Sequence, residues 1–358
     1  MNITQKLSLA ALVGLAPAAW AQSTVTLSGI IDAAVRSVTN EGAGSLTTVL
    51  SGSNSTSRLV FTAREDLGAG LAAGMHLEHG LLVDSGSPAS NEKYFDRRST
   101  VSLFSKDWGE LRLGRDFVPS YTAWSRHDPF AYVGAARSAN FVSATPVGPI
   151  RSAFGTSANT TVRSDNGVQW MLPRMAGGFE ASLMWAPSEG GTATNGLAEV
   201  SGARVGYTAS QWHVTAASTR TRNNLTVDGN FSDNVLGGGF TAMGTQFTAA
   251  WREFNYSQTS QAMVMVAAQR SFGLHEIKGS WIKTNMKGRV GTTSVDANDA
   301  TQLGIGYVYN LSKRTALYAT AAQISNDGQA RFVISDGRAG LVAAGTSKGY
   351  EAGIRHRF

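Results

Sequence analysis

Some residue types needed for covalent chemistry are present, but their spacing does not support an enzyme. Gly345-Thr346-Ser347-Lys348-Gly349 matches the Gly-x-Ser-x-Gly pattern of hydrolases. That pattern requires a strand, a sharp turn and a helix around the serine, followed by an acid and a histidine later in the chain. Only a strand-length segment follows Ser347, and no aspartate occurs beyond Asp336. We therefore expect no enzymatic activity and no catalytic residue.

The histidines and cysteines also predict no metal or cofactor site. His76 and His79 are three residues apart, which places them on opposite faces of a strand, so that they cannot share an ion. The remaining histidines have no ligand spacing, and the chain contains 0 cysteines, which excludes thiolate ligands and disulfides. No phosphate-binding glycine motif of the Walker or dinucleotide kind occurs. We predict no cofactor and no bound metal.

Charge is the remaining chemical feature of the sequence. The formal net charge is +6, yet only 16% of residues are charged, below the roughly 25% of a soluble domain. The arginines are scattered rather than clustered on one helix, which argues against nucleic-acid binding. Between Phe117 and Thr160 the chain has one acid, Asp128, and three arginines, Arg126, Arg137 and Arg151. Lining a narrow passage, such a segment would attract anions.

The segments that carry these charges are predicted to be β-strands, because the character of their side chains alternates with a period of two residues. In residues 25–36, 179–185 and 302–311, apolar side chains alternate with polar or small ones. A barrel strand with one lipid face and one wet face alternates in this way, and so does a β-sandwich strand. For a barrel, the expected lumen face includes Asp32, Arg36, Arg58, Arg163 and Glu180, and the expected outer face includes Leu59, Phe61, Val168, Trp170, Leu183 and Trp185.

The lengths of the connections favour a transmembrane barrel over a sandwich. Short turns at 66–70, 107–110, 176–178 and 312–314 alternate with longer polar stretches at 39–57, 85–94, 190–200, 226–234, 287–300 and 327–347. Short turns at one end and long loops at the other are typical of outer-membrane barrels. We predict about 16 antiparallel strands. The longest non-strand segment is Pro119–Thr160, and a loop of this length within a compact fold usually has a function.

The two ends of the chain fit the same interpretation. An apolar run ends in Ala19-Trp20-Ala21, which matches a signal-peptide cleavage site, and the run is too short to span a membrane as a helix. We expect a signal peptide over residues 1–21 and a barrel over residues 22–358. Phe358 should lie in the closing strand beside the first strand near Val25–Ile31, because an open barrel would leave backbone groups unpaired in lipid.

Several short segments resemble the general diffusion porins of Gram-negative bacteria, most closely their betaproteobacterial branch. In chain order they are Val25–Asp32, Ser57–Leu59, Glu65–Leu71, Leu113–Arg115, Asp128–Phe130, Leu311–Thr315 and Gly353–Phe358. The resemblance covers essentially all of residues 22–358. It implies a homotrimer of 16-stranded antiparallel transmembrane β-barrels, each with its third loop folded into the lumen. It also implies contact with outer-membrane lipid and lipopolysaccharide, and insertion by the outer-membrane barrel assembly machinery, for which the terminal aromatic residue serves as a signal.

The resemblance further implies a pore constriction. Family members carry arginines on the wall opposite the third loop, and the matching residues here are Arg58, Arg115 and Arg163, with Arg97 as a fourth candidate. Arg137 and Asp128 would face them from the loop. Alternation independently directs Arg58 and Arg163 into the lumen. It directs Arg115 toward lipid, at a cost of about 2–4 kcal/mol at the midplane, so we expect a bulge at Gly114 to turn it inward.

These observations predict an outer-membrane porin, a water-filled channel for passive diffusion of small hydrophilic solutes and ions that prefers anions. Two alternatives remain open. A substrate-specific channel for phosphate or an organic acid would bind its anion bidentately and give a saturable current. An outer-membrane hydrolase or adhesin barrel would need Ser, His and an acid on one rim, or loops longer and more apolar than these.

Overall fold

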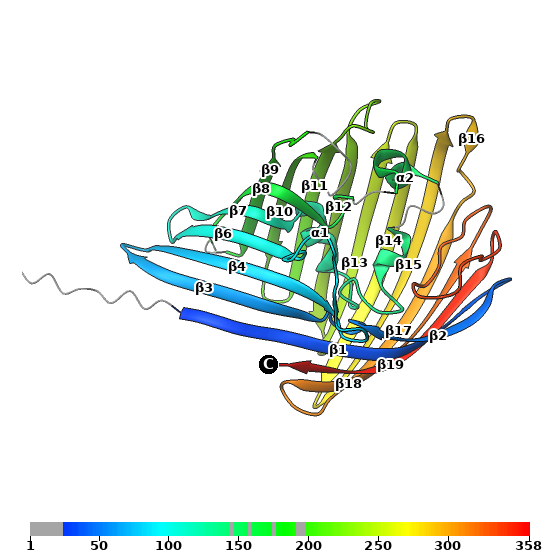
Figure 1. Cartoon of the computed structure of the whole chain (residues 1–358), viewed down its shortest axis with the longest axis horizontal. Helices are drawn as coiled ribbons and strands as arrows, with labels where there is room; N and C mark the ends of the chain where they lie inside the picture. Colours follow the sequence, from blue (N-terminus) through cyan, green and yellow to red (C-terminus); the bar gives the residue numbers. More distant parts are fainter. Residues whose placement is uncertain (1–23, 143–146, 157–158, 174–176, 191–197) are drawn as a thin grey trace, which may run out of the picture.

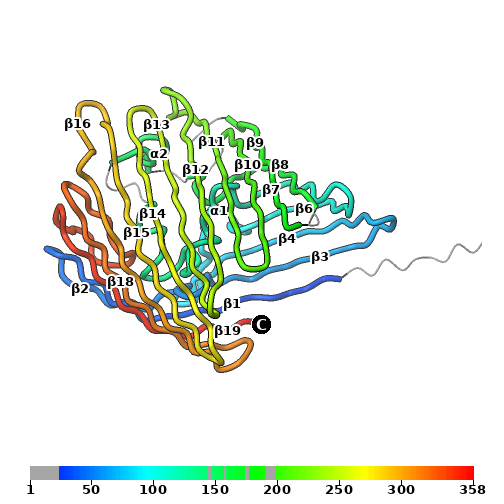
Figure 2. The backbone as a smooth tube through the Cα atoms, turned by 180° about the vertical axis from the view of Figure 1, so that it is seen from behind, coloured from blue at the N-terminus to red at the C-terminus, as the bar shows by residue number. Residues whose placement is uncertain are grey.

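The strands form one antiparallel sheet that closes on itself as a barrel (Figures 1 and 2). The computed structural model describes residues 24–142, 147–156, 159–173, 177–190 and 198–358. The expected signal peptide, residues 1–21, lies outside the described residues. None of the helices in the described part is long and apolar enough to cross a membrane.

The wall of the barrel follows chain order. Its strands are β1 (Thr24–Asn40), β2 (Gly44–Ser51), β3 (Arg58–Gly68), β4 (Leu71–Leu82), β6 (Arg98–Ser105), β7 (Gly109–Phe117), β8 (Arg163–Met171), β9 (Phe179–Ala186), β10 (Glu199–Thr208), β11 (Trp212–Arg222), β12 (Phe231–Ala242), β13 (Thr245–Tyr256), β14 (Thr259–Phe272), β15 (His275–Val290), β17 (Ala300–Asn310), β18 (Thr315–Asn326) and β19 (Thr346–Arg357). The connections hold β5 (Ser87–Pro88), β16 (Thr293–Ser294), α1 (Pro119–Ser125), the 3-10 turn η1 (Ser138–Phe141) and α2 (Pro149–Phe154).

The described strands make a 16-stranded barrel, as the sequence predicts. β2 pairs with Ala33–Asn40 of β1, and β3 pairs with the preceding part, Thr24–Ile30, so β2 and β3 together form one wall strand. β5 and β16 have two residues each and pair only within hairpin extensions of β4 and β15. Short turns at 69–70, 106–108, 209–211, 243–244 and 273–274 lie at one end, here called the short-turn end.

One predicted loop is in part a strand hairpin. The sequence pattern assigned residues 39–57 to a loop, but β1 continues to Asn40 and β2 occupies Gly44–Ser51. Threonine, valine and leucine in that segment pack well on a pleated surface, and Gly42 and Gly44, at φ +81° and +84°, allow the reversal between the strands. β12 and β15 likewise extend a few residues into segments 226–234 and 287–300.

Closure of the barrel uses the last residue of the chain. β19 pairs with β1 from Ile30 opposite Arg357 to Asn40 opposite Ser347. Phe358 continues this ladder, since its N–H donates to the Gly29 carbonyl (3.1 Å) and its carbonyl accepts from the Gly29 N–H (3.0 Å). The Phe358 ring occupies the space that a side chain at position 29 would fill. The pairing of Phe358 with the first strand is confirmed, although most of the seam lies beyond Ile31.

The two faces of the wall follow the predicted alternation. Asp32 and Arg36 are buried inside the barrel. Trp170, Leu183 and Trp185 are 38%, 52% and 53% exposed and belong to a large apolar outer surface, which in a membrane barrel is the lipid-facing band. The outer-face residue Phe61 is more covered, because the ring of Phe95 packs edge-on against it at 6.5 Å.

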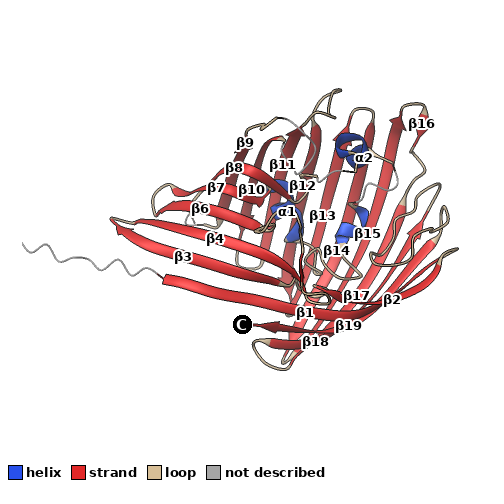
Figure 3. Cartoon of the chain, in the orientation of Figure 1, coloured by secondary structure: helices blue, strands red, loops and turns tan. Residues whose placement is uncertain are grey.

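The hydrophobic core lies inside the barrel, between the third loop and one side of the wall. Figure 3 shows the short helices of that loop within the barrel. The loop, residues 118–162, contributes Trp124, Phe130, Phe141, Ile150 and Phe154. The opposing side chains come mainly from β12 to β15, β18 and the connection after it, and include Val235, Phe254, Met263, Ile282, Ile324 and Phe332. These apolar contacts inside the barrel pack the loop against that side of the wall.

Candidate functional site

Polar side chains of the inner wall hold the third loop inside the lumen. Thr248 of β13 donates to the His127 carbonyl (2.9 Å), and Gln261 of β14 donates to the Phe141 carbonyl (2.7 Å). Gln302 of β17 donates to the Ala136 carbonyl (2.9 Å). Since a buried backbone carbonyl without a partner is costly, these contacts fit the loop to this side of the wall. The structure thus places the described part of Pro119–Thr160 inside the barrel, as the resemblance implied.

A buried ion pair strengthens the same attachment. Arg252 of β13 contacts Asp233 of β12 through two nitrogens, at 2.9 and 2.7 Å. Arg252 also donates to the Thr161 carbonyl (2.8 Å), and the Ser120 hydroxyl donates to Asp233 (2.7 Å). The pair therefore contacts both the beginning and the end of the loop.

Opposite this attachment, four arginines surround a cavity of about 420 Å³. Three of them, Arg58, Arg97 and Arg163, come from the wall around β3 to β8, and Arg137 comes from the loop. Tyr121 and Tyr132 of the loop also line the cavity, and uncharged residues complete the lining: Ser55, Thr56, Ala131, Val133 and Val162. The structure thus brings together four of the six residues that the sequence analysis assigned to a constriction.

Fixed contacts hold the three wall arginines in place around the cavity. Glu78 of β4 accepts from Arg97 Nε (2.5 Å) and lies 3.2 Å from Arg58 Nε. Arg163 Nε donates to the Arg97 carbonyl (2.6 Å), and its guanidinium lies 4.4 Å from the centre of the Phe117 ring. Glu78 thus contacts two of the four arginines, and the cavity lining itself has arginines as its charged residues, which gives it a surplus of positive charge.

On the loop, Arg137 is held by its own chain. Its Nε donates to the Asn140 side chain at 3.2 Å. Burial lowers the pKa of the Arg137 guanidinium below its usual value, and the neighbouring Arg36 lowers that pKa further. Arginine keeps its charge in proteins even so, and Arg137 therefore adds to the positive field on the loop side of the cavity.

Arg115 and Asp128 do not line this cavity. Arg115 donates to Asp165 Oδ1 and to the Asp96 carbonyl, both at 2.6 Å. The pairing of β7 with β8 is irregular between Gly114 and Asp116, where we expected a bulge, but the extra residue lies in β8 beside Asn166, whose φ is +57°. The irregularity lets Arg115 reach a carboxylate of the neighbouring strand.

Asp128 acts within the loop. Its carboxylate accepts from the N–H groups of Phe130, Tyr132 and Ser138 and from the Ser138 hydroxyl. Burial raises its pKa, and these hydrogen bonds act in the opposite direction. Because its oxygens are engaged inside the loop, Asp128 does not oppose the arginines of the cavity. Of the other loop arginines, Arg126 pairs with Glu180 (2.7 Å).

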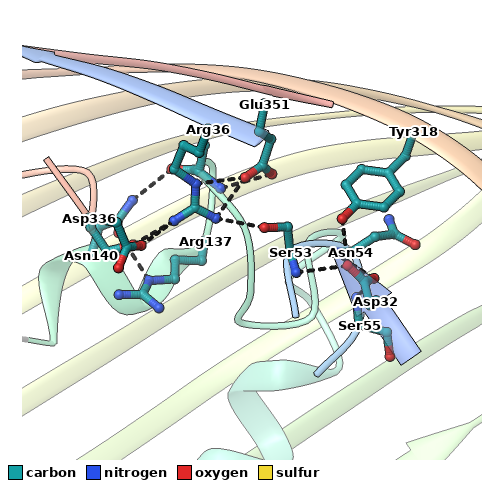
Figure 4. A network of polar contacts seen from close by, with 12 residues as sticks. Asp32, Arg36, Ser53, Asn54, Ser55, Arg137, Asn140, Tyr318, Asp336 and Glu351 are labelled. Atoms are coloured by element: carbon teal, nitrogen blue, oxygen red, sulfur yellow. Dashed lines mark hydrogen bonds and ion pairs between the residues drawn. The ribbon is translucent and has the colours of Figure 1, made fainter. Parts of the chain in front are cut away.

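A second polar network supports the cavity from the side of β1 and β19 (Figure 4). The Asp32 carboxylate accepts from the N–H groups of Ser53, Asn54 and Ser55 at 3.0, 3.1 and 2.8 Å, which folds the segment before Arg58 inward. Arg36 donates to Glu351 (2.8 Å), and Glu351 accepts from the loop N–H of Ala135 (3.0 Å). The network thus connects β1 and β19 of the wall to the third loop.

Some residues of the site were not identified from the sequence. Glu78 lies between His76 and His79, and attention to histidine spacing left it out. Alternation would have placed it on the lumen side, since it follows the outer-face residue Leu77. Tyr121 and Tyr132 had no signal of their own. Among the described residues no cluster of histidines, cysteines and acids could hold a metal ion. The arginines of this site can attract anions and donate hydrogen bonds to them.

Comparison with known proteins gives a consistent result. A family model described as Gram-negative porin matches residues 8–329. Outer membrane porin protein 32 of Delftia acidovorans is 35% identical over 99% of this chain and 100% of its own length. An anion-selective porin from Comamonas acidovorans has a similar structure, with a TM-score of 0.78 and 28% identity over 94% of this chain and 100% of its own. The trimer form of OmpT from Vibrio cholerae shares the fold, with a TM-score of 0.65 and 16% identity over 94% of this chain and 99% of its own.

Proposed function

Since the chain belongs to the Gram-negative porin family, we propose that its channel prefers anions among small hydrophilic solutes. The protein is an outer-membrane β-barrel porin and not an enzyme. Selectivity in such a channel depends on the radius and the charge of its narrowest part. The arginine-lined cavity between the third loop and the wall is our candidate for that constriction.

The carrying observation is the charge balance of the cavity. The charged residues that line the cavity are the four arginines Arg58, Arg97, Arg137 and Arg163. The acids nearby stand behind this lining: Glu78 contacts Arg58 and Arg97, and Asp336 and Glu351 act on Arg137. A narrow passage with low-dielectric walls focuses such a field and raises the local concentration of counter-ions. The relative described as an anion-selective porin, at 28% identity, supports the same preference.

Reversal potentials in a KCl gradient test this proposal. The wild-type channel should prefer chloride. Arg58→Glu combined with Arg163→Glu should shift the preference toward potassium, because two reversals change the lining by four charges. The shift should shrink at high salt, since the Debye length falls from about 10 Å at 0.1 M to about 3 Å at 1 M.

A matched control separates the constriction from the overall charge of the protein. Lys313→Glu with Arg314→Glu makes the same charge change in a turn between β17 and β18 and should leave the reversal potential nearly unchanged. A cation-selective wild-type channel at low salt would show that the four arginines do not control permeation.

The assembled form belongs to the same proposal. We propose a homotrimer in contact with outer-membrane lipid and lipopolysaccharide, inserted by the barrel assembly machinery after removal of residues 1–21. OmpT of Vibrio cholerae, which has the same fold, is described in a trimer form, and this supports the oligomer. Mass measurement of the purified protein, with Gln22 expected at its N-terminus, tests the cleavage.

A further inference from the structure

A second group of arginines lies on the same wall, nearer the short-turn end. Strand register aligns Arg64 of β3, Gly74 of β4, Ser102 of β6 and Arg112 of β7 in one row across the wall. Adjacent strands lie about 4.8 Å apart, so the backbones of the two arginines are roughly 14 Å apart. Glycine and serine between them leave a depression in the inner surface.

An aromatic ring forms one side of this depression. Phe104 lies one inward-facing position from Ser102 toward the short-turn end, and its ring covers Gly74, where an added Cβ would meet ring carbon Cε2 at 3.1 Å. The guanidinium of Arg64 lies 4.3 Å from the centre of the Phe104 ring. The resulting cavity has a volume of about 370 Å³ and is also lined by His76 and Arg98, which is the lower range of small-molecule sites.

The arginines around the depression differ in whether they form ion pairs. Arg112 lies 2.7 Å from Glu110 and 2.6 Å from Asp116. Arg98 shares Asp116 at 3.3 Å. Arg64 forms no ion pair with any described residue, and its partner is the face of Phe104. Three guanidinium groups and two carboxylates leave one positive charge, and the stacked Arg64 holds it where it can be reached from the lumen.

We propose that this depression binds a small organic carboxylate on its way between the constriction and the short-turn end. The carboxylate would pair with Arg64, whose planar donors suit two oxygens, and the carbon skeleton would lie against Phe104. The inference rests on the proposed function only in requiring that anions enter the channel. One uncompensated charge beside an aromatic ring favours a singly charged organic anion over a multiply charged inorganic one.

Block of the chloride current by benzoate tests the site. Benzoate added to the wild-type channel in a planar bilayer should lower the single-channel chloride current to a saturating level. Arg64→Gln should raise the half-blocking concentration at least tenfold, and Phe104→Leu should raise it severalfold while leaving the reversal potential in KCl unchanged. Inorganic phosphate at equal ionic strength should block much less well.

Matched variants make the outcome decisive. Arg314→Gln removes one positive charge from the turn between β17 and β18 at the short-turn end, and it should leave the benzoate block at its wild-type strength. Equal block in Arg64→Gln and wild type, an effect of Arg314→Gln equal to that of Arg64→Gln, or equal block by phosphate would each overturn the proposal. A wild-type channel that prefers potassium but still shows the Arg64-dependent block would refute the proposed selectivity and keep this site.

Discussion

Replacing Arg252 by methionine should detach the third loop from the wall. The Arg252 side chain is fully buried, and Asp233, its partner at 2.7 Å, is 1% exposed. Arg252→Met keeps much of the volume that packs near Phe254, whose ring centre lies 4.7 Å from the guanidinium. It leaves Asp233 buried with the Ser120 hydroxyl as its remaining side-chain donor. Removing one partner of such a pair costs about 3–5 kcal/mol.

The lost free energy should weaken the docking of the loop more than the stability of the barrel. The variant also removes the donor to the Thr161 carbonyl and the contact with the Tyr132 hydroxyl at 3.3 Å, while the backbone ladders of β12 and β13 stay intact. We therefore expect a larger and more variable single-channel conductance, and a weaker preference for chloride because the loop carries Arg137. The midpoint of urea unfolding should fall only modestly.

A second substitution identifies the unpaired charge as the cause. Arg252→Met with Asp233→Leu removes both charges and should recover most of the wild-type conductance, because an apolar replacement of a buried pair is often neutral. Arg204→Met breaks a more exposed pair with Glu180 at 2.7 Å and should cost about 1 kcal/mol or less. If Arg252→Met keeps the conductance and the selectivity of the wild type, the loop is not held by this pair.

Two further predictions concern the seam of the barrel and the acid sensitivity of the loop. Deleting Phe358 should lower the yield of inserted, heat-modifiable trimer on gels, because the two hydrogen bonds to Gly29 and the ring that covers it are lost; a wild-type yield would contradict this role. Burial lowers the pKa of His127 to about 4, and the stacked His213 ring, 5.2 Å away, and Arg126 act in the same direction. Protons therefore bind better to the detached loop than to the docked one, so docking should weaken as the pH falls from 6.5 to 4, by up to about 3 kcal/mol. The conductance should become unsteady in that range and return to steady behaviour in His127→Gln; identical pH profiles of the variant and wild type would exclude His127 as the cause.

The strand count and the facing of the wall could be predicted from the sequence because both depend on local patterns. Alternation with a period of two assigns each side chain of a strand to a face without knowledge of its partners. Trp185 and Asp32 therefore lie on the faces expected for them. Residues 39–57 were assigned wrongly because polar strand residues and loop residues have similar composition, and the hairpin of β1 and β2 differs from a loop only in its pairing.

The pairing of the charges could not be predicted, because it joins residues far apart in the chain. Arg36 and Glu351 are separated by 315 positions and meet only once β1 and β19 close the barrel. Arg115 looked like a member of the constriction by its motif, but the extra residue in β8 brings Asp165 within 2.6 Å of it. A bulge in a neighbouring strand leaves no clear mark in the sequence, so the partner of Arg115 became known only from the fold.

The arrangement of the core explains why the arginines face an open passage. The third loop is held by Thr219, Asp233, Thr248, Gln261, Gln302 and Glu351, which lie on β11 to β14, β17 and β19. Its apolar side chains pack on the same side of the barrel. Open space is thereby displaced toward β3 to β8, where Arg58, Arg97 and Arg163 lie. The depression beside Arg64 continues along that wall toward the short-turn end. An anion that follows the most positive surface would therefore follow one side of the barrel, and the apolar packing on the other side is what leaves that path open.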